Sequence, residues 1–353
     1  MIQWREGFVT RRVREWRGAV QLEVSIQDID AVPAIAYPDL VGEPVVGDRV
    51  LLNTNALELG LGTGGMAFVV AIPDRLPPDH GRPNGHIVKA RYSPLQTIRL
   101  AVDEEASPAR PIMERATHLA GMPVVTADLH SALPAILAAI HADAPGAKVA
   151  YVMTDGGALP AGLSRTLDAL ADELVGVVTA GQAWGGDLEA VNVHSGLLAA
   201  RHVLGADLTV VSQGPGNLGT GTTWGFSGVS VGESVNAAAT LGGRPVGSLR
   251  LSDADPRPRH RGVSHHSLTA YGQVALLPAD IAVPAGLRKS TLDALRPLAD
   301  RHRLVTVRTD GLEDALRKSP AQLSTMGRDL DDDPVYFLAA AVAGRHAASL
   351  LTA

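Results

Sequence analysis

The sequence contains no cysteine, which excludes thiol catalysis, disulfide bonds and cysteine-ligated zinc and fits a reducing compartment. Lysine is also scarce, with 4 residues against 27 arginines, a bias that we attribute to a GC-rich bacterial genome. No uncharged apolar run reaches the roughly 18 residues of a membrane helix. The N-terminus MIQWREGFVTRRVREW lacks the apolar core of a signal peptide. We therefore expect a cytoplasmic protein with no membrane partner.

Aromatic residues make up only 4% of the chain, and the formal net charge is −6. A nucleic-acid-binding protein usually has a basic footprint, so nucleic acid is not an expected partner. Apolar residues (46%) and charged residues (19%) occur at the frequencies of a folded globular protein. The length of 353 residues indicates about two domains.

Residues 1–100 have the alternating pattern of β-strands. In VQLEVSIQDI, the residues Val20, Leu22, Val24 and Ile26 share one face. AIAYPDL, GDRVLLNT and MAFVVAIP follow, separated by turn signals. We predict a small all-β domain, barrel-like and mainly antiparallel. The basic run RRVREWRG (11–18) is predicted to be a solvent-exposed strand face, with nucleic-acid binding by the barrel as the alternative.

Residues 101–353 have a different pattern. Valine-rich runs such as MPVVTAD, KVAYVMTD, LVGVVTAG and DLTVVSQG alternate with alanine- and leucine-rich stretches. This alternation is typical of a parallel sheet covered by helices on both faces. We predict a three-layer, doubly wound, mainly parallel α/β domain. The last helix, PVYFLAAAVAGRHAASLL, is apolar enough either to pack across the sheet or to form the interface of a homo-oligomer.

The ends of the predicted parallel strands are the place to look for a site. Ligands of an open parallel sheet bind beyond the carboxyl ends of its strands. Five predicted strands are followed by glycine, aspartate, histidine or threonine, whereas the strands themselves contain few polar residues. The residues after the first three of these strands that we expect to line a site are Asp128, His130, Asp155, Gln182, Asp187, Glu189 and His194.

Part of this set lies in TAGQAWGGDLEAVNVHSGL (179–197), where we predict that a helix begins at Asp187. Glu189 and Asn192 would then share a helix face, with His194 offset from it. The alternative is that Asp187 only caps the helix and that His194 is an ordinary polar residue at the boundary between helix and sheet.

The loop QGPGNLGTGTTWGFSG (213–228) is rich in glycine and threonine and follows a predicted strand. Its glycines match GxGxxG, but the next helix is expected only near Val229. Asp253 lies 34 residues beyond Gly219, whereas a dinucleotide fold has an acidic residue after about 20. We therefore favour binding of an anion or phosphate over binding of a dinucleotide. The residues assigned to the anion are Gly214, Gly216, Asn217, Gly219, Thr220 and Thr222.

The stretch DADPRPRHRGVSHHSLTAYG (253–272) concentrates ionisable groups. Asp253 and Asp255 are spaced to face one crevice, and the prolines stiffen the loop that follows. Three arginines on this loop are assigned to clamping a carboxylate or phosphate: Arg257, Arg259 and Arg261. The alternative is a solvated loop with an arginine–aspartate network.

The same stretch contains a predicted helix start, with Ser264 as the N-cap of SHHSL. His265 and His266 would lie in the first turn, where the helix dipole favours neutral imidazole. We assign acid–base catalysis to His265, His266, Asp253 and Asp255.

No cofactor is identified by the sequence. HExxH, HxH and EF-hand spacings are absent, so a divalent metal is an open alternative. It rests on the topology bringing together some of Asp128, His130, Asp155, Asp187, Asp253, Asp255 and His265.

Four long strings together resemble a known family: GDRVLLNTNALELGLGTGG, TAGQAWGGDLEAVNVHSGLLAARHVLGAD, VVSQGPGNLGTGTTWGFSG and SDADPRPRHRGVSHHSLTA. They are similar to a bacterial family catalogued as a domain of unknown function, number 3866, and the resemblance covers nearly the whole chain. It implies no activity, cofactor or catalytic residue.

The residues favour an enzyme that carries out hydrolysis or group transfer on a small anionic metabolite, phosphorylated or nucleotide-like. One alternative is a ligand-binding sensor or regulatory protein without turnover. Another is an oligomeric assembly protein whose polar loops serve only as an interface.

Overall fold

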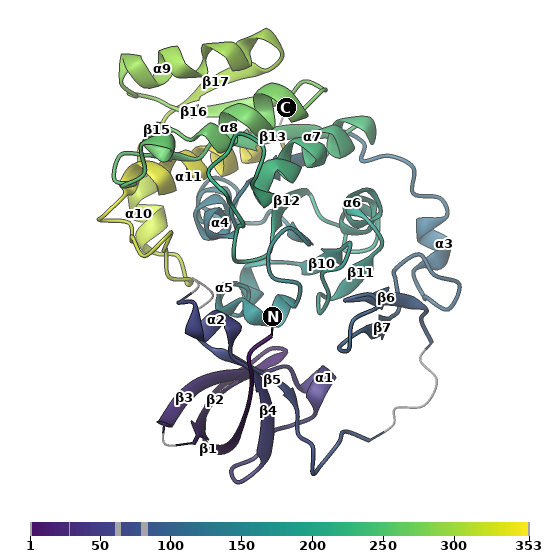
Figure 1. The fold of residues 1–353 in the computed structure, drawn as a ribbon. Coiled ribbons are helices and arrows are strands. Elements are labelled where there is room, and N and C mark those ends of the chain that lie inside the picture. Colours follow the sequence, from purple (N-terminus) through teal and green to yellow (C-terminus); the bar gives the residue numbers. More distant parts are fainter. Residues whose placement is uncertain (1, 28, 61–64, 79–83, 352–353) are drawn as a thin grey trace.

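The computed structural model describes residues 2–27, 29–60, 65–78 and 84–351. A small β-barrel lies below a larger α/β part (Figure 1). This arrangement confirms the predicted fold class. No helix in these described ranges is both long and apolar enough to cross a membrane.

The N-terminal barrel is closed by five strands. They are β1 (Trp4–Trp16), β2 (Ala19–Ile26), β3 (Ile29–Ala36), β4 (Arg49–Asn53) and β5 (Ala67–Ala71). They pair in the order β1-β2-β3-β5-β4, and β4 closes onto β1. Only the contact between β3 and β5 is parallel among the barrel pairings described. The predicted apolar face of β2 is buried inside the barrel, as period two requires. Two short helices, α1 (Pro38–Val41) and α2 (Asn55–Glu58), follow β3 and β4.

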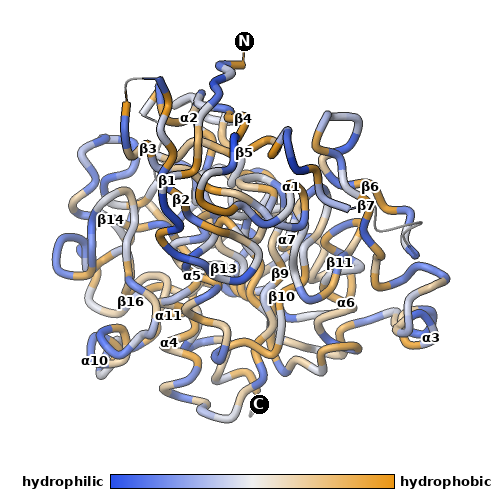
Figure 2. The backbone as a smooth tube through the Cα atoms, turned by 90° about the horizontal axis from the view of Figure 1, so that it is seen from below, coloured by the Kyte–Doolittle hydropathy of each residue, from blue (hydrophilic) through white to orange (hydrophobic). Residues whose placement is uncertain are grey.

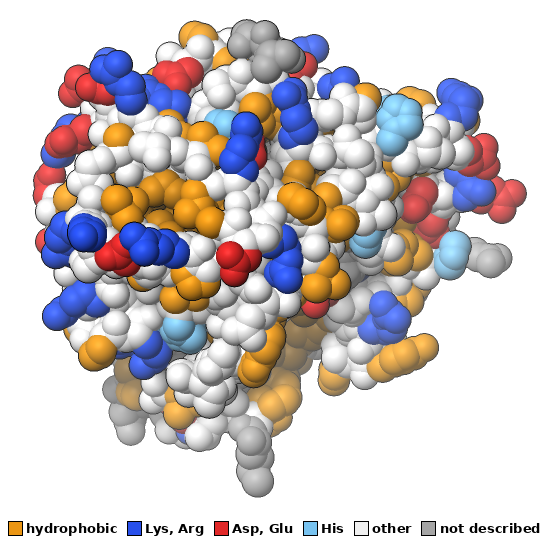
Figure 3. Space-filling model, turned by 90° about the horizontal axis from the view of Figure 1, so that it is seen from above, with side chains coloured by type: hydrophobic (Ala, Val, Ile, Leu, Met, Phe, Trp, Pro, Cys, Tyr) orange, Lys and Arg blue, Asp and Glu red, His pale blue; other side chains and the backbone are white. Residues whose placement is uncertain are grey.

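The basic run lies on β1 and the turn after it, and its arginines are neutralised by acidic partners. Arg12 pairs with Glu15 at 2.7 Å, and Arg11 pairs with Glu23 on β2. Figure 3 shows the side of the molecule that faces away from the barrel, where basic and acidic side chains are also interspersed rather than gathered by sign. A continuous basic field is what nucleic-acid binding would need.

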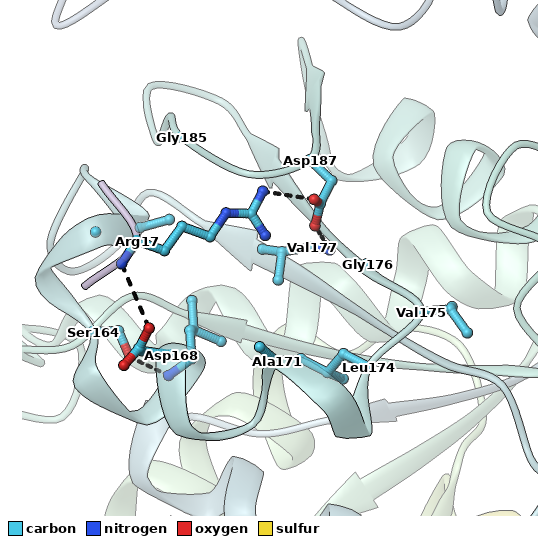
Figure 4. A pocket seen from close by; sticks show the side chains of 13 residues that line it. Arg17, Ser164, Asp168, Ala171, Leu174, Val175, Gly176, Val177, Gly185 and Asp187 are labelled. Carbon is cyan, nitrogen blue, oxygen red and sulfur yellow. Dashed lines mark hydrogen bonds and ion pairs between the residues drawn. The ribbon is translucent and has the colours of Figure 1, made fainter. Parts of the chain in front are cut away.

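The turn between β1 and β2 docks the barrel onto the α/β part (Figure 4). Trp16 donates its indole N–H to the carbonyl of Gly162 at 2.7 Å, and Arg17 pairs with Asp187 at 2.6 Å. The backbone N–H of Arg17 also approaches Asp168. A cavity of about 130 Å³ lies beside these contacts.

A hairpin of β6 (Ile87–Lys89) and β7 (Thr97–Arg99) follows the barrel. Lys89 is fully buried and donates to the carbonyls of Gly181 and Ala190, with Glu189 at 3.5 Å. Burial lowers the pKa of Lys89, and the charge of Glu189 opposes this shift. The hairpin is therefore fastened to the α/β part, while the predicted domain boundary at residue 100 stays a prediction.

The central sheet has eight strands. They are β8 (Pro123–Thr126), β9 (Val149–Thr154), β10 (Gly176–Ala180), β11 (Leu188–Ala190), β12 (Leu208–Gln213), β13 (Arg244–Ser248), β16 (Asp280–Pro284) and β17 (Arg303–Val307). The order is β11-β10-β9-β12-β8-β13-β16-β17, and each described pairing is parallel. Strand β12 is inserted between β8 and β9, which are consecutive in the chain.

Helices cover both faces of the sheet. Tyr151 and Met153 of β9 pack in the cluster that contains α4 (Leu133–Asp143), α10 (Leu312–Arg317) and α11 (Pro334–Ser349). Their neighbours Ala150 and Val152 pack on the other side with α3 (Arg110–Met113), α6 (Val193–His202) and α7 (Val231–Thr240). Buried strands in parallel sheets are apolar on both faces for this reason. In Figure 2 hydrophilic segments lie near α3 and α10, at the edge of the α/β part.

Short helices complete the fold. They are α5 (Arg165–Ala169), α8 (His265–Thr269), α9 (Lys289–Leu295), η1 (His130–Ala132), η2 (Ala161–Leu163), η3 (Ala171–Glu173), η4 (Ser227–Ser230), η5 (Pro258–His260), η6 (Ala270–Val274) and η7 (Arg296–Asp300). A two-stranded ladder joins β14 (Leu251–Ser252) to β15 (Gly262–Val263).

The C-terminal helix α11 packs across the sheet and against α4, which is the first of its two predicted roles. Gly344 permits this close approach, because an added Cβ would lie 2.2 Å from the carbonyl oxygen of Ile136. We expect Gly344→Ala to lower the free energy of unfolding by about 2 kcal/mol, measured by urea denaturation. Gly146→Ala is the control, since no atom lies within 4 Å of its added Cβ. Equal stability of the two variants would contradict this packing account.

One predicted helix is wrong at its start. Leu188–Ala190 forms strand β11, and helix α6 begins only at Val193, with Asn192 as its N-cap. Asp187 therefore caps no helix, and it accepts a hydrogen bond from the N–H of Val177 at 2.8 Å. Glu189 and Asn192 consequently share no helix face. A strand of three residues is too short to leave a readable period in the sequence.

Candidate functional site

The site is built at the carboxyl ends of three neighbouring central strands. Asp128 follows β8, Gln213 ends β12 and Arg250 follows β13. The order of strands in the chain changes direction here, which is where open parallel sheets form ligand crevices. Arg250 is 4% exposed and Asp128 is 6% exposed, so both charges belong to the interior rather than to a solvated rim.

A loop returns three histidines to this edge. The ladder of β14 and β15 closes residues 253–261 into a loop, which carries His260 at the end of η5. Helix α8 then begins with Ser264 as its N-cap, as predicted. Ligand atoms of His260, His265 and His266 lie within 4.8 Å of one another. The structure therefore brings both adjacent histidines, and a third, to one place.

The glycine-rich loop supplies one wall of this imidazole cluster. Phe226, at the end of that loop, stacks on His266 with ring centroids 3.8 Å apart and planes 3° from parallel. It also meets the ring of His265 edge-on at 5.8 Å. Packing of this kind fixes ring orientation.

Burial and nearby positive charge lower the pKa values of His260 and His265. Burial lowers the pKa of His260 to about 3, helped by the charges of Arg250 and Arg257. Burial, followed by the neighbouring charge of His266, also lowers the pKa of His265. The carbonyls of Arg259 and Thr222 oppose this shift. Neutral imidazole accepts either a proton or a metal ion.

Asp128 faces the cluster with an unused oxygen. Its Oδ2 is buried and accepts no hydrogen bond from the described residues. The same atom lies 3.5 Å from Nδ1 of His266 and 4.0 Å from the Arg250 guanidinium. Arg250 also approaches Nδ1 of His266 at 3.2 Å, so this imidazole lies between a carboxylate and a cation.

Asp255 anchors the loop beneath the histidines. It is fully buried and accepts two hydrogen bonds from the Arg257 side chain, at 2.9 and 2.8 Å. Arg328 lies at 3.3 Å and Arg250 at 3.6 Å from the same carboxylate. Burial would raise the pKa of Asp255, but the hydrogen bonds and charge of Arg257 hold it far below its usual range.

The glycine-rich loop is held mainly by its own side chains. The Gln213 amide donates to the carbonyl of Asp128 and to Oδ1 of Asn217, both at 2.7 Å. The hydroxyls of Thr220 and Thr222 lie 3.0 Å apart and bond within the loop. At Gly221, which has a φ of 83°, the turn passes beside Arg259. An added Cβ there would lie 3.6 Å from the guanidinium carbon.

The sequence-assigned residues divide into two groups. Asp128, Asp255, His265 and His266 lie in the histidine cluster or around Arg250 beside it, and Arg257 and Arg259 border the cluster. Asp253 points outward to Arg288, and Arg261 is exposed. Gly214 lies against the loop after β9, and Gly219 bridges to Phe226. At Gly216 the chain turns with a φ of 89°.

The remaining predicted residues have partners elsewhere. His130 lies in a buried chain between Tyr151 at 2.9 Å and Ser164 at 2.7 Å. Asp155 accepts from the N–H of Gln182 at 2.7 Å. The other three are Asp187 on Arg17, Glu189 near Lys89, and His194, which is exposed.

Sequence reasoning gave no role to several residues of the crevice. His260 lies only five positions before His265, and that spacing was the available signal. Arg250 lies between two leucines in the apolar run PVGSLRLS. An arginine in such a run is expected to be buried and to need acidic partners. Phe226 and Arg328 reach the crevice only through tertiary structure.

Fold and site together define an α/β protein with an appended β-barrel and a cluster of three histidines at the carboxyl edge of its sheet. The chain belongs to DUF3866, the family described as a protein of unknown function, which matches residues 33–344. Comparison with curated proteins and with solved structures gave no match.

Proposed function

We propose that this histidine cluster catalyses hydrolysis or group transfer on a small anionic substrate. The observation that carries the proposal is the meeting of three imidazoles beside the unused carboxylate oxygen of Asp128. Groups with perturbed pKa values that converge in a crevice are typical of catalytic sites.

The anion would be held at the outer side of the cluster. Arg257 is paired with Asp255, whereas Arg259 is exposed and lies beside Gly221, so we assign the anion to Arg259. An anion there would lie next to the glycine-rich turn and to His265, whose backbone partner is the carbonyl of Arg259. The imidazole cluster would activate the attacking water or hydroxyl group.

A thermal-shift panel tests the anion site. The panel contains nucleotides, sugar phosphates and small carboxylates. We expect one anion class to raise the unfolding midpoint by several degrees at about 100 times its Kd. Arg259→Ser should abolish the rise, whereas Arg288→Ser, an exposed arginine paired with Asp253, should keep it. A rise that survives Arg259→Ser would remove the anion from this place.

Turnover of the same compounds tests catalysis. Substituting His265 by glutamine should lower the rate by about 100-fold or more, with His194→Gln as the exposed control. Binding without turnover would favour the sensor reading. If no compound binds or reacts, assembly would be favoured, although α11 is already buried against the sheet.

A further inference from the structure

We propose that His260, His265 and His266 bind one divalent transition-metal ion through their three Nε2 atoms. The ion would be the cofactor of the proposed catalytic site. Its catalytic role rests on the proposed function, but the binding of the ion does not.

In each of the three rings, Nε2 is the nitrogen available to bind a metal ion. Nδ1 of His260 lies 2.7 Å from the Ser264 hydroxyl, and Nδ1 of His265 faces the carbonyl of Arg259 at 3.4 Å. Nδ1 of His266 lies between Asp128 and Arg250. Every Nδ1 therefore has a partner, and no hydrogen bond from an Nε2 of the three is found within the described ranges.

This arrangement is the one that metal-binding histidines adopt. Their second ring nitrogen usually donates to a carboxylate, a backbone carbonyl or another oxygen, which fixes the ring and its tautomer. Here the Ser264 hydroxyl faces Nδ1 of His260, and the Arg259 carbonyl faces Nδ1 of His265. The carboxylate of Asp128 lies in the matching place beside His266. For His266 the Arg250 guanidinium lies nearer to Nδ1, at 3.2 Å, than Asp128 does at 3.5 Å. Metal binding through Nε2 requires that Nδ1 donate to Asp128 and that Arg250 turn to Asp255, which lies 3.6 Å away.

A second observation points to a ligand between the rings. Nε2 of His265 is buried and has no hydrogen-bond partner in the described part of the chain. A buried polar atom without a partner costs about 1–3 kcal/mol. The unused Oδ2 of Asp128 lies in the same cluster. A cation between the imidazoles would satisfy the nitrogen and complement the carboxylate.

The distances require only a small closure. Nitrogens bound to zinc at about 2.1 Å in a tetrahedron are about 3.4 Å apart. One ring nitrogen of each histidine already lies within 4.8 Å of one from each of the other two. His265 is the most exposed of the three, so its ring has the most freedom to close the remaining gap.

The ligand set indicates the class of metal. Imidazoles suit zinc, cobalt and nickel, whereas magnesium and calcium prefer oxygen. Three protein ligands leave the fourth tetrahedral position open, as in catalytic zinc sites. That position is where a water molecule or the anion beside Arg259 would bind. In this arrangement the imidazoles act as ligands rather than as proton acceptors.

The test uses the full chain without a histidine tag, stripped with dipicolinate and dialysed against Zn²⁺ or Co²⁺. We expect one metal ion per chain by mass spectrometry of the metal content. Bound Co²⁺ should give the visible absorption bands of a four-coordinate nitrogen and oxygen site. Asp128→Asn should weaken Zn²⁺ binding by about 10–100-fold, and His265→Gln should weaken it further. His194→Gln, an exposed control, should bind as the parent chain does.

Less than one ion per chain, or a folded His265→Gln variant with parental affinity, would overturn the metal site. Circular dichroism of each variant separates loss of binding from loss of fold. Different results would contradict the metal site and the proposed catalytic function. Metal binding with no turnover of any anion would remove the catalytic function and keep the site. Turnover by the stripped chain would remove the metal's role and keep the function.

Discussion

Asp255→Ala will lower the free energy of unfolding by about 3–5 kcal/mol, while Asp253→Ala will change it by less than about 1 kcal/mol. The two aspartates are two positions apart, but their surroundings differ. Asp255 is fully buried and balances Arg250, itself only 4% exposed. Removing the carboxylate leaves that guanidinium with less opposite charge in the interior.

Guanidinium denaturation of both variants at pH 7 measures this difference. Asp253 is the matched control because it pairs with Arg288 at the exposed surface. Charge screening by the denaturant affects the exposed pair more than the buried one, so a urea titration should accompany it. A loss at Asp255 no larger than that at Asp253 would show that the buried carboxylate does not support the loop.

The metal-free chain will lose stability as the pH falls from about 6.5 towards 4. Burial lowers the pKa of His260 to about 3 and that of His130 to about 4 in the folded chain, whereas an unfolded histidine titrates near 6.5. In this window the unfolded chain therefore binds protons that the folded chain does not, and acid favours unfolding. His260 alone contributes about 3 kcal/mol of this loss by pH 4.

The measurement is the free energy of unfolding by urea at half-unit pH steps, with chelator present. His260→Gln should flatten the pH dependence, while His194→Gln should keep the parental slope because His194 is exposed. Asp255 contributes to acid denaturation only below its unfolded pKa, near pH 3.9, so its loss is separable. A parental slope in His260→Gln would mean that His260 titrates normally.

The layers of the fold could be predicted because they depend on the pattern of apolar and polar residues within short segments. Alternation in β2 predicted the barrel, and valine-rich runs predicted buried parallel strands. The order of the sheet was not readable, because nothing local in β8 or β9 records that β12 will lie between them. Strand β11 was not predicted because three residues are too few to show the alternation of apolar and polar residues that marks a strand.

The sequence predicted which segments contain the site, but it did not predict which side chains contact one another there. The density of charge in 253–272 marked the loop, and Ser264 marked the start of α8. The spacing of Asp253 and Asp255 suggested a shared crevice, but it could not show that one carboxylate turns inward to Arg328, 73 positions away. Pairings at such separations are fixed by tertiary packing, which one sequence does not record.

The insertion of β12 sets an order in which the chain can fold during synthesis. When β8 and β9 have first been made, their common neighbour has not, and the one edge of each that pairs with β12 has no native partner. Those edges stay open until residue 213 has been added, because β12 pairs with both. Pairing between segments so far apart is slow and leaves strand edges exposed. Newly made chains of about 150–210 residues are therefore the stage at which this protein most needs protection from aggregation.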